Sequence, residues 1–233
     1  MHYDRVILGT FIDRPNRFIA ICEITDPDTG QKAVSRCHVK NTGRCREILV
    51  PGARVVLSVS DNPDRKTAFD LIAAYKNGIL INIDSQAPNK AFQEFIPRSG
   101  LFGKEPIIHP EYTHGDSRFD FFIEDGDRRC LVEVKGVTLE FDGECRFPDA
   151  PTERGLKHLR GLRDALSEGY ESYAAFVVQM KPMRCFTPNY STHEEFGEVL
   201  EEVHRDGVGI LVYDCAVTPD SMAVDSPLPF KFR

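Results

Sequence analysis

Residues 118–138, RFDFFIEDGDRRCLVEVKGVT, constrain the fold most, because they place charges inside two runs of strand-forming apolar residues. An Asp-Gly pair joins the two runs, and this predicts an antiparallel hairpin. Asp120, Glu133 and Lys135 have aromatic or β-branched neighbours, as expected for a central strand pair that is covered on both faces. A buried charge is costly unless a partner or a metal compensates it. The hairpin therefore predicts a compensated polar site.

The predicted strand pairing of the hairpin places Asp120, Glu133 and Lys135 close together. With Asp125-Gly126 at the centre of the turn, Asp120 is expected opposite Leu131. Because side chains alternate, Asp120, Glu133 and Lys135 then share one face, with the two carboxylates diagonal neighbours about 7 to 8 Å apart. Carboxylates at that separation can share Mg²⁺ or Mn²⁺, which also bind substrate phosphate. The same spacing equally fits a cross-strand salt bridge on a solvated hairpin face.

The chemistry expected of such a site is phosphodiester hydrolysis. The metal activates water and neutralises developing charge, while a lysine orients the nucleophile or stabilises an oxyanion. This interpretation makes Asp120, Glu133 and Lys135 the candidate catalytic residues. Glu94, on a helix expected before the hairpin, is a further candidate metal ligand beside Asp120 and Glu133.

The first part of the chain is typical of a small β-barrel. Short strand-like runs alternate with turn signals at residues 26–31, 40–44 and 61–66, and no long helix pattern intervenes. This arrangement predicts a five-strand barrel of the oligonucleotide/oligosaccharide-binding (OB) type. The Pro and Asn of residues 84–90 indicate a connection, which divides the chain into domains of residues 1–84 and 85–233.

The second part mixes helices and strands. A short helix is expected over 88–97, closing before Pro97. After the hairpin, leucines at helical spacing predict a helix that ends at Gly169, followed by a buried strand over 173–180. Thr192 and Glu195 form a capping box for another helix, and a last buried strand follows. The order predicts an α/β (α+β) fold with a mixed sheet.

The net charge and its distribution along the chain limit the classes of binding partner. The net charge of −7 argues against a protein that coats nucleic acid by bulk attraction. Residues 1–84 nevertheless carry a net +2, and residues 85–233 a net −9. Basic turns on a barrel with available aromatic rings, Phe11, Phe18 and Tyr75, suit single-stranded nucleic acid. Ordinary solubilising loops explain the same residues, and oligosaccharides are a third possibility.

The candidate nucleic-acid-binding residues fall into two groups. The basic residues of the barrel are Arg36, Lys40, Arg44, Arg46, Arg65 and Lys66. In the second part the candidates are Arg118 and, near the N-terminus of the helix that follows Thr152, Arg154, Lys157 and His158, because a helix N-terminus favours anions. A solvated surface explains this second group about as well, and His158 alternatively pairs with a core carboxylate.

The remaining sequence features indicate a soluble cytoplasmic protein. No apolar run approaches the roughly 20 residues that cross a bilayer, and the first residues lack the pattern of a secretory signal. Seven scattered cysteines form neither a CxxC pair nor a disulfide pattern. No membrane partner is expected. The oligomeric state stays open, a homodimer included.

Several long blocks resemble one family. HVKNTGRCREILVPGARVVLS, GDSRFDFFIE, CLVEVKGVTLE and FPDAPTERGLKHLRGL are similar to the sugar fermentation stimulation protein A (SfsA) family, and the resemblance runs from about Gly9 to Tyr213. It implies an N-terminal OB barrel, a C-terminal PD-(D/E)xK nuclease-like domain and DNA binding. Asp120, Glu133 and Lys135 match that fold's motif, which binds Mg²⁺ or Mn²⁺, and Glu94 matches a glutamate of its first helix.

The resemblance leaves two functions open. One is a DNA-binding protein with a metal-dependent phosphodiesterase domain. The other is a non-catalytic DNA-binding regulator of sugar-metabolism genes that keeps the same fold, since the family name reports a phenotype rather than a reaction.

Overall fold

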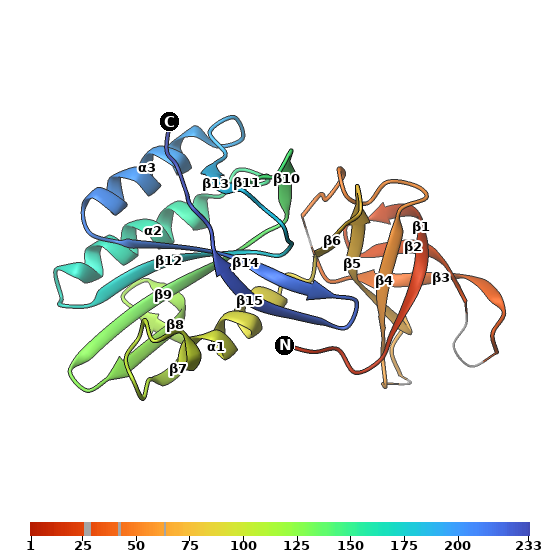
Figure 1. The fold of residues 1–233 in the computed structure, drawn as a ribbon, viewed down its shortest axis with the longest axis horizontal. Coiled ribbons are helices and arrows are strands. Elements are labelled where there is room, and N and C mark those ends of the chain that lie inside the picture. The colour runs from red at the N-terminus through yellow and green to blue at the C-terminus, as the bar shows by residue number, and fades with distance from the viewer. Residues whose placement is uncertain (26–28, 42, 63) are drawn as a thin grey trace.

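The computed structural model describes residues 1–25, 29–41, 43–62 and 64–233. The expected turns at residues 26–31, 40–44 and 61–66 therefore lie partly outside the described residues. Two units, each built on its own six-stranded sheet, lie side by side, with the barrel at one end of an elongated molecule (Figure 1).

The first unit contains the predicted five-strand barrel, formed by β1 to β5, with β6 paired to the edge of β5. Its strands follow the order β3-β2-β1-β4-β5-β6, and an additional parallel pairing of β3 with β5 closes the sheet. Apolar side chains such as Cys22, Val55 and Leu71 alternate toward the interior and are fully buried. The strands are β1 (Val6–Asn16), β2 (Ile19–Thr25), β3 (Lys32–Val39), β4 (Arg54–Val59), β5 (Phe69–Lys76) and β6 (Ile79–Asn82).

The second unit contains the predicted mixed sheet, in the order β15-β14-β12-β9-β8-β7. β9, β12 and β14 are parallel, and the outer pairings are antiparallel. The strands are β7 (Ile107–His114), β8 (Ser117–Asp125), β9 (Arg128–Val137), β12 (Glu171–Val178), β14 (Gly209–Thr218) and β15 (Ser221–Pro227). A small sheet joins β10 (Leu139–Phe141), β11 (Glu144–Phe147) and β13 (Cys185–Pro188).

Three helices cover the two faces of the mixed sheet. α1 (Ala87–Ser99) lies on one face, and α2 (Glu153–Leu166) and α3 (Glu194–Arg205) lie on the other (Figure 1). Thr152 caps α2, because its side chain accepts a hydrogen bond from the Gly155 backbone N–H. The expected capping box of α3 is wrong, since His193 is its N-cap and makes no side-chain cap hydrogen bond.

The end of α1 also differs from the expectation. The helix continues through Pro97 to Ser99 and stops at Gly100, which adopts the left-handed conformation at φ 68°. A proline inside a helix removes one backbone donor. Burial of Phe92, Phe95 and Ile96 against the sheet keeps the last turn in place despite that loss.

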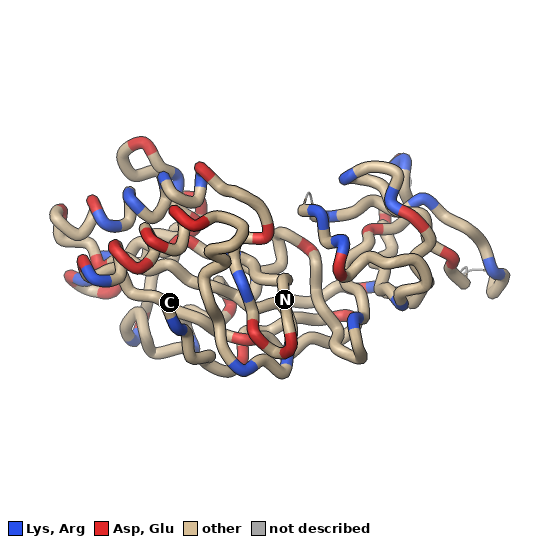
Figure 2. Tube along the Cα trace, turned by 90° about the horizontal axis from the view of Figure 1, so that it is seen from above, with Lys and Arg blue, Asp and Glu red and all other residues tan. Residues whose placement is uncertain are grey.

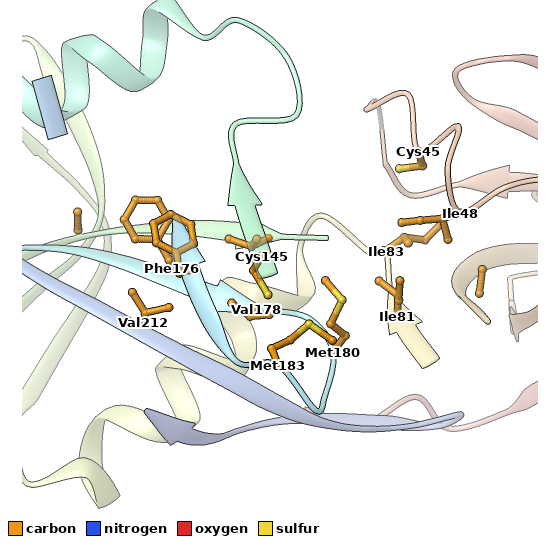
Figure 3. Close-up of a cluster of buried hydrophobic side chains, with 14 of the residues drawn as sticks. Cys45, Ile48, Ile81, Ile83, Cys145, Phe176, Val178, Met180, Met183 and Val212 are labelled. Atoms are coloured by element: carbon orange, nitrogen blue, oxygen red, sulfur yellow. The ribbon is translucent and has the colours of Figure 1, made fainter. Parts of the chain in front are cut away.

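One apolar core runs through the junction between the two units (Figure 3). Met180 and Met183 follow β12 and lie between Val178 of the mixed sheet and Ile81 and Ile83 of the barrel. All five side chains are buried. Their continuous burial argues for a fixed relative placement of the two units, because separating them would expose this apolar surface.

A polar network completes the junction beside this core. Nε2 of Gln179 donates to the backbone carbonyls of Asn82 (2.9 Å) and Asp84 (3.2 Å). The Asp84 carboxylate accepts from the Tyr3 hydroxyl (3.1 Å) and contacts the Lys40 ammonium (2.8 Å). Gln179, Asn82 and Asp84 are all buried. Each bond of Gln179 therefore satisfies a group that water does not reach.

We expect Gln179→Met to lower the free energy of unfolding by about 2 kcal/mol, because two buried carbonyls lose a donor while the side chain keeps its length. Urea denaturation followed by circular dichroism measures the change. Gln31→Met, at an exposed position, is the matched control and should stay within about 0.5 kcal/mol of the parent. Equal stabilities for both variants would contradict the assigned role of Gln179.

Candidate metal centre

The hairpin of β8 and β9 forms with a register different from the predicted one. Asp125 pairs with Arg128, so the loop consists of Gly126 and Asp127, with Gly126 at φ 60°. The predicted turn centre was therefore wrong, and the pairing shifts by two residues. An even shift would by itself keep each side chain on its predicted face, but alternation breaks at Asp120, because Phe119 and Phe121 lie in different apolar cores. Continuing the register places Asp120 opposite Glu133, where the pairing of β8 with β9 has ended.

Glu133 is buried in the sheet, and two cationic or donor groups surround it. Its Oε1 accepts a hydrogen bond from Nζ of Lys135 at 2.5 Å and contacts Nδ1 of His158 on α2. Burial alone would raise the pKa of Glu133, but the contacts with His158 and Lys135 outweigh burial and lower the pKa below its usual range. Glu133 is therefore ionised at neutral pH.

Asp120 lies in a different electrostatic setting. Its Oδ1 accepts from Nδ2 of Asn89 on α1, and its Oδ2 accepts from the backbone N–H of Val134, both at 2.7 Å. Burial and the nearby charge of Glu133 raise the pKa of Asp120 to about 6, although both hydrogen bonds oppose the rise. Two carboxylates thus compete for too little positive charge.

One atom of this site has no partner. Oε2 of Glu133 is buried and accepts no hydrogen bond from any described residue. A buried carboxylate oxygen without a partner is costly, and a cation bound there removes the cost. The described residues contain no group of three or more His, Cys, Asp or Glu side chains poised to hold a metal. Two carboxylates nevertheless fit Mg²⁺ or Mn²⁺, which usually bind one or two carboxylates and complete their coordination with water or phosphate.

Asn89, rather than Glu94, is the α1 residue that reaches Asp120. The Glu94 carboxylate contacts the N-terminal amino group of Met1, and its side chain is 59% exposed. The structure therefore does not bring Glu94 into contact with Asp120 or Glu133. Sequence reasoning missed Asn89 because it searched for a carboxylate, although an amide at the first turns of the same helix carries a suitable donor.

Several predicted nucleic-acid-binding residues have partners inside the protein. The Lys40 ammonium pairs with the buried Asp84 carboxylate. Arg65 makes a two-point contact with Asp70, at 2.5 Å and 2.9 Å, and Nδ1 of His38 contacts the same carboxylate. These pairs correct the expectation that Lys40 and Arg65 present free charges.

The other predicted cations divide by exposure. Arg118 pairs with Glu111 at the surface, and Arg154 donates to Nε2 of the buried His158 at 3.4 Å. His158 is thus a partner of a core carboxylate, which was the alternative expectation, and not a surface phosphate ligand. Five candidates are exposed and form no side-chain hydrogen bond or ion pair with the described residues: Arg36, Arg44, Arg46, Lys66 and Lys157.

The barrel aromatics also differ from the expectation. Phe11 belongs to the barrel core and is 2% exposed, so it offers no surface for stacking. Tyr75 is covered by the guanidinium of Arg54, which lies 3.7 Å from the ring centroid. Phe18 is 45% exposed and carries Arg17 at 4.8 Å. Phe18 alone of the three remains available to a ligand.

Comparison with known proteins assigns the family. The N-terminal OB domain of SfsA matches residues 12–83, and the sugar fermentation stimulation protein RE domain matches residues 86–221. The chain belongs to the sugar fermentation stimulation protein family. The homologue from Desulfitobacterium hafniense (strain DSM 10664 / DCB-2) is 51% identical over 95% of this chain and 94% of its own length. The homologue from Clostridium beijerinckii is 49% identical over 96% of each chain.

A solved structure shares the fold over the whole chain. The Pyrococcus furiosus SfsA in complex with Ca²⁺ aligns with a TM-score of 0.86 and 24% identity, covering 99% of this chain and 98% of that one. Both predicted units, the OB barrel and the α/β domain with its mixed sheet, are thus those of the family. Within the described residues, no helix has the length and apolarity needed to span a bilayer.

We expect Asp70→Asn to lower the free energy of unfolding by about 1 to 2 kcal/mol at pH 7, because Arg65 and His38 lose a charged acceptor. Burial alone would raise the pKa of Asp70, but the hydrogen bonds from Arg65 and His38 lower it below its usual range. A lowered folded-state pKa stabilises the protein above the unfolded pKa, about 3.9, and this contribution is lost as the pH falls through the folded pKa.

The difference between Asp70→Asn and the parent should therefore shrink as the pH drops below about 4. Urea titrations at pH 7, 5, 4 and 3 measure it. Asp61→Asn, at an exposed carboxylate 3.8 Å from Arg5, is the control with a small and pH-independent effect. A difference that grows toward acid pH would show that the sign assigned to Asp70 is incorrect.

Proposed function

We propose that the chain is a DNA-binding protein of the cytoplasm whose domain of residues 85–233 hydrolyses phosphodiester bonds of nucleic acid with Mg²⁺ or Mn²⁺. The barrel of residues 1–84 holds the nucleic acid. The observation that carries the proposal is the unpartnered, buried Oε2 of Glu133 beside Asp120, whose pKa is raised by burial and by the charge of Glu133. A divalent cation satisfies both carboxylates at once.

The chain supplies the groups that such a reaction needs. A bound Mg²⁺ or Mn²⁺ would lower the pKa of a water and neutralise charge that develops on the phosphate. Asp120 and Glu133 bind the ion, and Asn89 and His158 fix the directions of the two carboxylates. Lys135 keeps a positive charge beside Glu133, where it stabilises the more negative phosphate of the transition state.

Two likenesses support this proposal. An Asp on one strand followed by Glu-x-Lys on its neighbour, Asp120 with Glu133 and Lys135, resembles the PD-(D/E)xK arrangement of metal-dependent nucleases. The P. furiosus relative was solved with Ca²⁺, a hard cation that takes oxygen ligands as Mg²⁺ and Mn²⁺ do. OB domains bind single-stranded nucleic acid as one of their common ligands, and this supports nucleic acid as the substrate.

We expect Glu133→Gln to reduce Mn²⁺ affinity at least tenfold and to abolish cleavage, because the amide removes one anionic ligand. Isothermal titration calorimetry measures the affinity. Gel analysis of labelled single- and double-stranded DNA and RNA, in Mg²⁺, Mn²⁺ or EDTA, measures cleavage. Glu94→Gln is the matched control, the same substitution at a carboxylate that contacts Met1, and should behave as the parent.

Glu133→Gln and Glu94→Gln also show which carboxylates bind the metal. Loss of Mn²⁺ binding in Glu94→Gln would show that Glu94 is a metal ligand. Products that form in EDTA, or in Glu133→Gln, would refute the catalytic role of this site.

The second candidate function is a non-catalytic DNA-binding regulator. The observation that favours it is the close pairing of Lys135 and His158 with the same oxygen of Glu133, an arrangement that also serves purely structural compensation. A regulator binds DNA with steep salt dependence and yields no products in either metal. The cleavage assay therefore separates the two functions directly.

A further inference from the structure

A hollow of about 450 Å³ lies at the junction of the barrel and the α/β domain. Asn41, Gly43 and Arg44 line it from the barrel. Gly136 at the end of β9 and Gln179 after β12 line it from the other side. Gly136 directly follows Lys135 in the chain, so the wall of the hollow comes within one residue of the metal centre.

The floor at Gly136 is closely packed. A Cβ at this position would lie 2.4 Å from Oε1 of Gln179 and 2.7 Å from Cγ of Pro88. The absence of a side chain at Gly136 thus lets the chain of β9 pass against Gln179 while the hollow stays open. At Gly136 itself a ligand would contact backbone and the Gln179 amide, whereas Arg146 and Phe147 line another part of the hollow.

The hollow continues across the barrel surface. A second hollow of about 290 Å³ shares Gly43 and Arg44 with the first and extends to Arg17 and Arg46. A third, of about 190 Å³, shares Asn41 with the first and is lined by Phe18. We call this continuous surface the seam groove, and its defining residues are Arg17, Phe18, Asn41, Gly43, Arg44, Arg46, Gly136 and Gln179.

Arg14 fixes the barrel side of the seam groove. Its Nη1 donates to the backbone carbonyls of Gly43 (2.8 Å) and Arg44 (2.7 Å). Its Nη2 donates to those of Arg17 (2.8 Å) and Asn41 (2.8 Å). All four carbonyls belong to residues of the groove. Because these hydrogen-bond partners of Arg14 are carbonyl oxygens and not carboxylates, its charge adds to the positive potential of the groove.

The groove combines positive charge with one exposed ring. Arg44 and Arg46 are exposed, and Arg17 covers part of the Phe18 ring at 4.8 Å. Figure 2 shows basic segments on the edge of the barrel that faces the α/β domain, whereas acidic and basic segments alternate along the helices. A basic groove beside an aromatic ring is how proteins commonly hold single-stranded nucleic acid.

We propose that the seam groove holds a single nucleic-acid strand and leads it from the barrel to the metal centre. The phosphates follow Arg46 and Arg44, a base stacks at Phe18 beside Arg17, and the strand enters the 450 Å³ hollow next to Gly136. A cavity of this size takes a ligand of one or two nucleotides, whereas a duplex needs a groove wide enough for both strands. The inference rests on the proposed function only for the cleavage of the strand at the metal centre.

Two substitutions test the path in different ways. Ala150→Trp fills the 450 Å³ hollow from the loop before α2, at a residue whose methyl side chain makes no hydrogen bond that the substitution would break. Arg44→Glu reverses a charge in the middle of the groove. The controls are Ala68→Trp on an exposed barrel turn and Lys104→Glu on the exposed loop after α1, both outside the groove.

Fluorescence anisotropy in EDTA, with a labelled 20-nucleotide single strand and a blunt DNA hairpin, measures binding without cleavage. We expect both groove variants to weaken single-strand binding about tenfold and hairpin binding no more than about twofold. The controls should stay within about twofold of the parent for both probes. Calorimetry with Mn²⁺ checks that each variant keeps the metal centre intact.

Each outcome decides the inference. Unchanged single-strand binding in both groove variants, equal loss for single strand and hairpin, or a parent that binds neither probe would overturn it. The proposed function is judged separately, by cleavage in Mg²⁺ or Mn²⁺. If the parent cleaves and the groove variants bind the single strand normally, the proposed function stands and the path is refuted. If the groove variants lose single-strand binding and the parent yields no products in Mg²⁺ or Mn²⁺, the path stands and the proposed function is refuted.

Discussion

The buried carboxylate of Glu133 is the constraint on which the rest of the site depends. A carboxylate at 4% exposure in the middle of a sheet is tolerated only with compensation. Lys135 on the same strand and His158 on α2 provide it through one oxygen. α2 must therefore dock with its His158 side toward β9, and the other oxygen of Glu133 has no hydrogen-bond partner among the described residues.

The architecture was predictable from the sequence to a large extent. Strand patterns gave the barrel, and leucine spacing gave α2, because burial on one face imposes periodicity. β10, β11 and β13 were not predicted, since strands of three or four residues leave too short a pattern. The hairpin register was wrong by two residues, and the expected alternation does not hold at Asp120, because Phe119 and Phe121 on either side of it lie in different apolar cores.

The charged residues of the candidate site were predictable from the sequence, whereas the residues that contact them were less so. Asp120, Glu133 and Lys135 were found from their apolar surroundings, whereas Asn89 was missed because a helix amide carries no distinctive signal. Lys40 and Arg65 were expected at the surface but pair with Asp84 and Asp70. Lys40 and Asp84 are 44 positions apart in the sequence, and Arg65 and Asp70 are five positions apart. Only the folded chain shows which carboxylate each basic residue contacts.

The junction connects these observations to a function. Apolar packing around Met180 and Met183 and the bonds of Gln179 hold the barrel against the α/β domain, so that the basic turn fixed by Arg14 lies beside the end of β9. The proposed nucleic-acid-binding surface and the candidate metal centre are thereby held in one arrangement. Neither the barrel nor the α/β domain alone contains the whole groove.

The most direct measurement is an anomalous difference map from a crystal soaked in Mn²⁺. The account predicts a strong peak within coordination distance of Asp120 and of Oε2 of Glu133, with no peak at Glu94. A well-ordered crystal with no peak at Asp120 and Glu133, or with the ion bound elsewhere in the α/β domain, would contradict the central claim.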